Sequence, residues 1–217
     1  MPRVYTYILK SDTGFAPNPF GGVCTLACCK PTIRRTAARH DWVVGLSSKA
    51  QGNKIIYAME VDREPLGFAD YHNSPEYKLK IPDITSKNLI KHLGDNIYRP
   101  LPDGGFKQLP SRHSNPDGSQ DKFHKERDLR GKKVLISSNF YYFGCSAVEL
   151  PEKFKGVIVG RSYRVNYHPP DLGKSLIKWL TNEFEPGMHG NPHKAPFISA
   201  SMDSARHDFN SRVFPLC

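Results

Sequence analysis

The stretches DWVVGLS (residues 41–47) and KIIYAMEV (residues 54–61) decide the fold, because both are short, apolar and bounded by polar residues. β-Branched and aromatic residues of this kind are typical of strands. The second stretch also alternates as a strand does, with one face formed by Ile55, Tyr57, Met59 and Val61. A short polar loop with Gly52 and Asn53 joins the two stretches. The sequence therefore predicts an antiparallel hairpin.

Outward from this hairpin, the pattern predicts further strands at residues 3–9, 133–143 and 156–160. Apolar residues at helical spacing predict a helix over 172–185, with Asp171 as its N-cap and Pro186 at its end. Short helices are expected within 65–80 and over 86–93, the latter capped by Thr85. The proline- and glycine-rich stretches 12–22 and 99–121 are expected to be irregular.

Together these elements predict one α+β domain spanning residues 1–217, since no repeat or low-complexity linker divides the chain. We expect a curved, mainly antiparallel sheet or barrel with flanking helices. Residues 187–217 are polar and basic for most of their length and are expected to form a C-terminal tail packed on the domain.

The charge balance indicates a class of partner. Lysine and arginine number 31 against 21 acidic residues, a net charge of +10, which favours polyanions such as DNA, RNA or nucleotides. A merely basic soluble surface is the alternative, and lipid headgroups are a weaker one because no basic amphipathic helix stands out. No run of 18 apolar residues predicts a membrane span. The sequence shows no secretory leader. The number of cysteines is odd, at five, which argues against a disulfide framework. We therefore expect a cytoplasmic protein.

Familiar catalytic motifs are missing from the sequence, including the Walker loop, the dinucleotide-binding glycine pattern and the zinc-protease helix. Cys24 and Cys28 have the spacing of one zinc-ligand pair, but a second pair is lacking, since Cys145 and Cys217 are isolated. We therefore predict no metal site and interpret Cys24, Cys28 and Cys29 as small buried residues. The sequence leaves the cofactor undetermined.

Two basic clusters are candidates for phosphate binding. Residues 30–40 contain four cations and no acid, and we expect phosphate contacts from Lys30, Arg34, Arg35 and Arg39. Residues 122–133 contain six cations against Glu126 and Asp128. Nearby aromatic residues, Phe20, Trp42 and Tyr142, could stack on a base. The alternative for both clusters is a solvated charged face above core aromatics.

Polar residues on predicted loops are candidates for acid–base work or base recognition. Asp95 and His113 could act as general acid–base groups, and Asn18 and Asn96 could bond to base edges. Cys24 would be a nucleophile only if a neighbouring base or helix end lowered its pKa. Loop residues of these types more often stabilise turns.

Several stretches, taken in order, resemble the second of the nucleotide modification associated domain families: YTYIL (5–9), GFAPNPF (14–20), GVCTLA (22–27), CKPTIRRT (29–36), DWVVG (41–45), IYAM (56–59), GDNIY (94–98), HS (113–114), VLIS (134–137) and YFG (142–144). The resemblance extends over about the first 160 residues. It implies an association with phage and bacterial systems that modify nucleic-acid bases or act on altered ones, with partner enzymes of such a system, and it implies no settled active site.

The hairpin is also similar to part of a PUA-like barrel, as in EVE, YTH and ASCH domains. That similarity implies a basic cleft that takes a flipped base into an aromatic-lined pocket. Trp42, the loop 12–22 and the segment 94–114 would then surround one pocket.

Three functions are consistent with these observations. The first is a module that binds nucleic acid or a nucleotide and recognises a modified or flipped base. The alternative is an enzyme acting on a base or nucleotide, with Asp95 and His113 as acid–base groups and Cys24 as the nucleophile. A structural subunit of a modification system is a third. An enzyme requires titratable groups within hydrogen-bond reach at the pocket floor, whereas a binding module needs only stacking and edge contacts.

Overall fold

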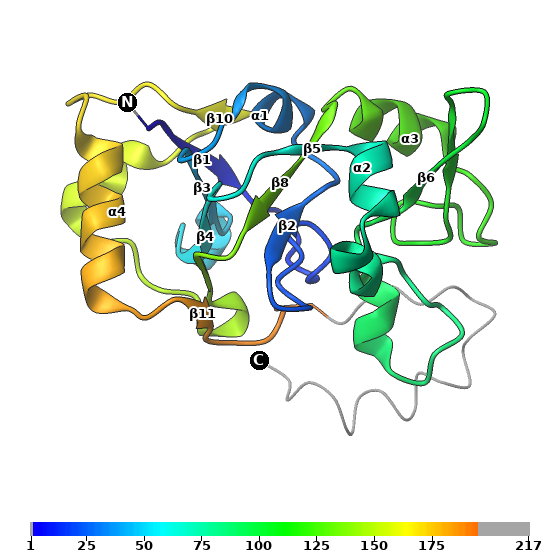
Figure 1. The fold of residues 1–217 in the computed structure, drawn as a ribbon. Helices are drawn as coiled ribbons and strands as arrows, with labels where there is room; N and C mark the ends of the chain where they lie inside the picture. The colour runs from blue at the N-terminus through cyan, green and yellow to red at the C-terminus, as the bar shows by residue number, and fades with distance from the viewer. Residues whose placement is uncertain (1, 195–217) are drawn as a thin grey trace.

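A six-stranded mixed sheet lies at the centre of the computed structural model, which describes residues 2–194 (Figure 1). Its strands follow the order β10-β1-β3-β4-β9-β11. Their bounds are β1 Val4–Ile8, β3 Trp42–Leu46, β4 Ile55–Glu60, β9 Phe140–Tyr142, β10 Tyr163–Arg164 and β11 Gly187–Met188. The predicted hairpin is confirmed as β3 and β4, with Val43 opposite Met59.

β1 and β3 run parallel, so the chain between them must leave the sheet and return. This connection contains β2 (Cys24–Leu26) and α1 (Pro31–Thr36). β2 joins β8 (Lys133–Ser137) and β5 (Leu66–Gly67) in a second, antiparallel sheet. A separate hairpin is formed by β6 (Tyr98–Pro100) and β7 (Phe106–Gln108).

The elements stack in four layers (Figure 1). α4 (Leu172–Glu183) and the 3₁₀ helix Glu152–Val157 cover one face of the large sheet through Leu176, Leu180 and Phe154. The other face packs against the second sheet. Beyond the second sheet lie α2 (Phe68–Asn73) and the β6–β7 hairpin. The remaining helices are α3 (Lys122–Leu129) and 3₁₀ turns at Lys49–Gln51, Pro75–Lys80, Leu89–Leu93 and Gly144–Ser146.

The α+β class and the single domain are as expected, but the expected barrel is wrong. Within residues 2–194 no sheet closes on itself, because the two-residue strands β10 and β11 are the edges of the large sheet and do not pair with each other. The large sheet is mainly antiparallel, as expected, but mixed: β1–β3 and β9–β11 are parallel, and the other three pairings are antiparallel. The expected tail is described as far as residue 194, and the rest of it lies outside the described residues. No helix within the described range is long and apolar enough to cross a membrane.

The apolar run 133–143, predicted as one strand, forms two strands in different sheets. β8 belongs to the second sheet and β9 to the first, and the backbone N–H groups of Ser138 and Asn139 between them donate to the Asp62 carboxylate. A continuous apolar run is expected of any strand buried on both faces, so the sequence pattern does not reveal the turn.

Other local predictions also change. Residues 86–93 form only the 3₁₀ turn Leu89–Leu93, whose N-cap is Asn88 rather than Thr85. The stretch 156–160 is not a strand, since the 3₁₀ helix ends at Val157. The expected loop 99–121 contains most of the β6–β7 hairpin. The predicted helix at 172–185 is confirmed as α4, although Asp171 makes no side-chain cap bond.

Arg34 fastens α1 to the second sheet and to α3. Its side chain is fully buried, and its guanidinium donates to three backbone carbonyls: Cys29 (2.7 Å), Lys133 (2.8 Å) and Asp128. A Cβ at Gly131 would approach that guanidinium to 2.3 Å, so only glycine fits there. Arg34 therefore has a structural position, and the basic run 30–40 does not act as one uniform surface.

We predict that Arg34→Ala lowers the free energy of unfolding by about 3 kcal/mol or more, because it leaves buried carbonyls without donors. The matched control is Arg35→Ala, an exposed neighbour on the same helix, for which a change within about 0.5 kcal/mol is expected. Urea unfolding of both variants measures the difference. Equal stability of the two variants would contradict this role for Arg34.

Candidate functional site

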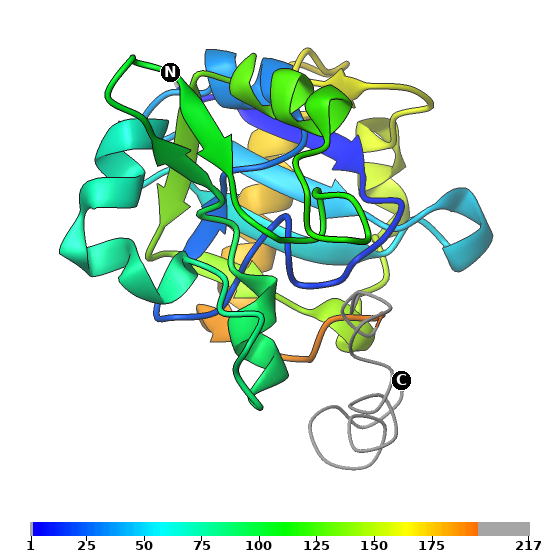
Figure 2. The ribbon, with the colours of Figure 1, turned by 90° about the vertical axis from the view of Figure 1, so that its right-hand side faces the viewer.

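A pocket of about 570 Å³ opens at the carboxyl end of β1. Its walls come from four segments distant in sequence: residues from 7–16, the turn before α1, the loop 112–116 and α3. In Figure 2 the loop that follows the β6–β7 hairpin lies beside the segment after β1. The pocket therefore exists only where the tertiary fold brings these segments together.

Positive charge dominates the pocket wall. Lys10, Lys30, Arg112 and Arg127 line it, and none of its described lining residues is acidic. Burial lowers the pKa of both Lys30 and Arg112. Grouping cations in a partly enclosed space concentrates positive potential, which an anionic ligand would neutralise. The pocket is thus suited to a phosphate-bearing molecule.

A cysteine, a histidine and an aspartate are aligned at this pocket. The Cys29 Sγ atom lies 3.5 Å from His113 Nε2, and His113 Nδ1 lies 2.5 Å from the Asp128 carboxylate. This is the order of groups that activates a thiol: a nucleophile, a base within reach, and a third group that orients the base. Hydrogen-bond geometry at apo sites is often loose, so the 3.5 Å separation is compatible with this role.

The charge state of Asp128 determines the tautomer of His113. Burial opposes ionisation of Asp128, but the hydrogen bond from His113 and the charge of Arg34 lower the pKa of this carboxyl to about 2. An ionised carboxylate only accepts hydrogen bonds, so Nδ1 of His113 must donate. Burial also lowers the pKa of His113, which leaves its ring neutral at pH 7. Nε2 therefore carries the lone pair of the ring, which accepts from Arg127 Nη2 at 3.3 Å and lies within reach of the Cys29 proton.

The resting thiol is protonated. Burial, together with the charge of Asp128, raises the pKa of Cys29 to about 11, against the opposing effect of Arg127. The Arg127 Nη2 atom lies 3.9 Å from Cys29 Sγ and 3.3 Å from His113 Nε2. A thiolate formed at Cys29 would lie beside this guanidinium. Such a site would generate the thiolate by proton transfer during reaction rather than hold it in advance.

The backbone turns sharply to place Cys29 in the pocket. Cys29 and Lys30 both have left-handed backbone angles, with φ of 59° and 39°. Non-glycine residues in such conformations cost on the order of 1 kcal/mol or more, and they concentrate at functional sites. The Cys29 N–H donates to the Asp128 carboxylate at 2.9 Å and holds the turn. The preceding Cys28 is buried and does not line the pocket; its thiol lies 3.6 Å from the carbonyl oxygen of Asp95 and within 4.8 Å of polar atoms of His113 and Asp128.

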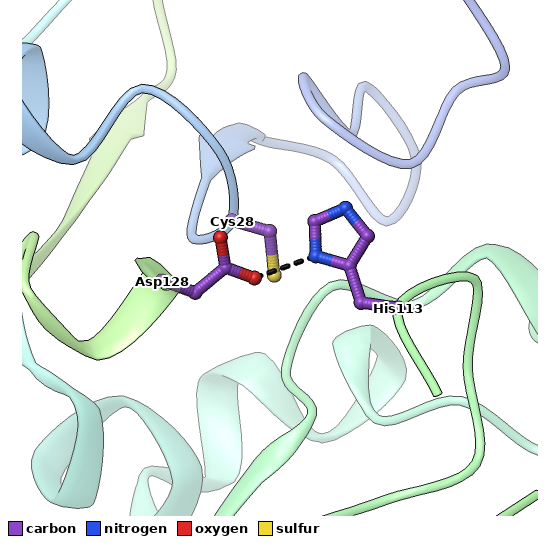
Figure 3. A group of neighbouring side chains, drawn as sticks. All are labelled: Cys28, His113 and Asp128. Atoms are coloured by element: carbon purple, nitrogen blue, oxygen red, sulfur yellow. Dashed lines mark hydrogen bonds and ion pairs between the residues drawn. The ribbon is translucent and has the colours of Figure 1, made fainter. Parts of the chain in front are cut away.

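Cys28, His113 and Asp128 also form the group closest to a metal site within the described residues (Figure 3). Ligand atoms around a tetrahedral zinc ion, with bonds of about 2.0–2.3 Å, lie about 3.3 Å or more apart. The 2.5 Å between His113 and Asp128 is too short for both to be ligands and is that of a direct hydrogen bond. Burial also raises the pKa of the Cys28 thiol well above its usual range. These residues do not fit a metal ion in this arrangement.

Among the residues expected to be catalytic, the structure brings only His113 to the pocket. Cys24 is fully buried between the two sheets. Asp95 is also fully buried, and its carboxylate accepts bonds from Thr25 (2.7 Å) and Tyr71 (2.8 Å). Both therefore support the core. Cys24, Cys28 and Cys29 are free thiols, as expected.

Of the residues expected to bind nucleic acid, Lys30 alone lines the pocket. Five are buried among structural partners: Asn18, Arg34, Trp42, Asn96 and Tyr142. Asn18 accepts from Lys80 at 2.8 Å, for example, and Trp42 packs in the core shared with α4. Phe20 is half-buried beside Gly14, and Arg35 and Arg39 are exposed outside the pocket wall.

Sequence reasoning missed Cys29, Asp128, Arg127, Arg112 and Lys10. The available signal for Cys29 was its place directly before Lys30 and Pro31, and Asp128 was one of only two acids in the second basic cluster. Neither signal distinguishes a site residue from a core or surface residue. Only the contact between Cys29 and Asp128 in the folded chain does so.

Comparison with known families adds one match. The family model described as nucleotide modification associated domain 2 matches residues 1–199. The match includes every segment that lines the pocket, and it extends beyond residue 160, where the resemblance in the sequence was expected to end. Comparisons with curated proteins and with solved structures found no match.

We predict that iodoacetamide labels Cys29 in the native protein but not Cys24 or Cys28, which have no exposed surface. Because the thiolate is the reactive form, the labelling rate should rise about tenfold per pH unit from pH 8 until it levels off near pH 11. Mass spectrometry of the labelled peptides gives the rates. A plateau near pH 8.5, the ordinary pKa of a cysteine, would contradict the buried environment described for Cys29.

Proposed function

Because the chain belongs to the nucleotide modification associated domain 2 family, we propose that it is an enzyme that modifies a nucleotide unit in the basic pocket. The observation that supports this proposal most directly is the alignment of Cys29, His113 and Asp128 at the pocket. A module that only recognises a nucleobase needs stacking and edge contacts. It does not need a proton-accepting side chain beside a thiol.

In the proposed reaction Cys29 is the nucleophile. Its thiol proton passes to His113 Nε2 while sulfur forms a bond to an electrophilic, unsaturated carbon of the nucleotide. The electron pair displaced from that carbon takes the proton back from the imidazolium, so the adduct is neutral and no further reactant is consumed. Asp128 keeps His113 in the required tautomer and stabilises the imidazolium. Arg127 stabilises the sulfur while it carries negative charge.

The remaining wall residues bind the substrate in this proposal. Lys10, Lys30 and Arg112 neutralise the phosphate, and Arg is well suited to a bidentate phosphate contact. The hydroxyl groups of Ser11 and Thr13 are available to the sugar or base edge. These contacts hold the reactive carbon near Cys29, and positioning of this kind supplies much of the rate of a covalent step.

The second candidate is a module that recognises a modified or flipped base without turnover, working beside partner enzymes of a base-modification system. The raised pKa of Cys29 favours it, because a thiol with a pKa of about 11 is a poor nucleophile at neutral pH. The two functions share the pocket and its anionic ligand, and they differ in whether Cys29 forms a bond.

We predict that wild-type protein forms a covalent adduct with a plain or base-modified nucleotide, free or within an oligonucleotide, and that Cys29→Ser reduces this adduct at least 100-fold. The matched control is Cys28→Ser, which changes the adjacent thiol outside the pocket wall and keeps a donor toward the Asp95 carbonyl. It should retain the product within a few-fold. Mass spectrometry of both protein and oligonucleotide provides the measurement.

Two results would decide against the enzyme. Tight binding of an oligonucleotide with no mass change in either component would favour the recognition module. An equal yield of product from Cys29→Ser and wild type would show that Cys29 is not the nucleophile.

A further inference from the structure

Phe123, in the first turn of α3, leaves 68% of its surface exposed. The large exposed apolar side chains in the described part of the chain are Leu79, Phe123 and Met188, and Phe123 is the aromatic one. A single exposed apolar residue needs no explanation by itself. Phe123, however, is connected to the pocket through neighbouring aromatic side chains.

A continuous series of rings connects Phe123 with the pocket. The Phe123 ring lies 5.6 Å from that of His124, edge to face. The His124 ring stacks on that of His113 at 4.7 Å, and the His113 ring lies 4.8 Å from that of Phe15. His124, His113 and Phe15 all line the pocket. Aromatic surface therefore extends without a break from the pocket wall to the exposed face of α3.

The helix that carries Phe123, with the residues that follow it, is basic. Lys122, Lys125, Arg127 and Arg130 belong to α3 or its end, and Lys132 and Lys133 follow. Of the two acids in this segment, Asp128 is buried and bonded to His113 and Tyr98, which leaves Glu126 as the exposed one. The Arg127 guanidinium lies 6.0 Å over the Phe123 ring, and its Nη2 is 3.3 Å from His113 Nε2. One arginine thus joins the exposed ring to the proposed site.

We propose that the substrate is a single-stranded polynucleotide that lies along α3, with an unpaired base stacked on Phe123 and the nucleotide to be modified in the pocket. This inference rests on the proposed function for the identity of the pocket and extends it from a nucleotide to a strand. Exposed aromatic rings beside cations that follow the backbone are the features that bind single strands.

The alternatives fit these features less well. A free nucleotide would occupy only the pocket and would leave the exposed ring and the cations of α3 without a role. In a duplex both faces of each base are covered by stacking, so an intact double helix cannot use Phe123. A protein partner would need an acidic surface with an apolar recess, and competition by salt and nucleotides in the test below would distinguish it.

The test measures binding, so it does not depend on the chemistry of Cys29. Fluorescence anisotropy would be recorded with a labelled 12-residue oligo(dT), with unlabelled dTMP as competitor, at two salt concentrations. Wild type should bind the oligonucleotide at least tenfold more tightly than dTMP, with an affinity that falls as salt rises. Phe123→Ala should lower the affinity for the oligonucleotide about fivefold or more, and its affinity for dTMP should stay within twofold of that of wild type.

The matched control is Leu79→Ala, which removes an equally exposed apolar side chain from the 3₁₀ helix Pro75–Lys80, away from the pocket wall. Its affinity for the oligonucleotide should equal that of wild type. Phe123→Tyr keeps a stacking ring and should restore most of the affinity. Both substitutions are at exposed positions, so thermal unfolding should confirm that each variant remains folded.

Three results would overturn the strand proposal. These are equal oligonucleotide affinity of Phe123→Ala and wild type, equal affinity of wild type for the oligonucleotide and dTMP, and tighter binding of the matching duplex than of the single strand. None of them removes the thiol chemistry, which the Cys29→Ser and Cys28→Ser comparison tests separately on nucleotides of any length. Failure of the strand proposal is therefore distinct from failure of the proposed enzyme.

Discussion

The buried carboxylate of Asp128 is the group on which the site depends. It has no exposed surface, yet it is ionised, because donors from three other segments surround it. These donors are the Cys29 N–H (2.9 Å), the Tyr98 hydroxyl (2.9 Å) and the His113 ring (2.5 Å). Burying a charge without such partners would cost several kcal/mol, so the segments that supply them are held together around it.

The same carboxylate has two opposite effects on the proposed chemistry. It orients His113 so that Nε2 accepts a proton, and its negative charge helps to raise the pKa of Cys29. The thiol is consequently kept protonated until His113 removes its proton. This arrangement also protects Cys29, since the thiolate rather than the thiol reacts with oxidants and stray electrophiles.

The layered fold explains why the pocket lies at the carboxyl end of β1. The parallel pairing of β1 and β3 requires the chain to leave the large sheet, and on its way back it makes the turn at Cys29 and Lys30. Arg34 then anchors α1 to the carbonyl of Asp128, so the turn and α3 are fixed to each other. The cations of the wall come from both sides of this junction.

The sequence alone determined the local elements and the chemical character of the protein. The period of two in residues 54–61 and the helical spacing in 172–185 identified β4 and α4, because these patterns reflect contacts each element makes along its own length. The surplus of cations, the resemblance to a family, and the candidacy of His113 and Lys30 as site residues were also visible in the sequence.

Tertiary structure alone decided which neighbouring residues have different environments. Arg34 is buried and Arg35 exposed, Cys28 faces the core and Cys29 the pocket, and the run 133–143 divides between two sheets. The physical reason is that each outcome depends on a partner far away in the sequence. Asp128 accepts a hydrogen bond from the N–H of Cys29, which lies 99 residues away in the sequence, and no local pattern encodes a contact at that separation.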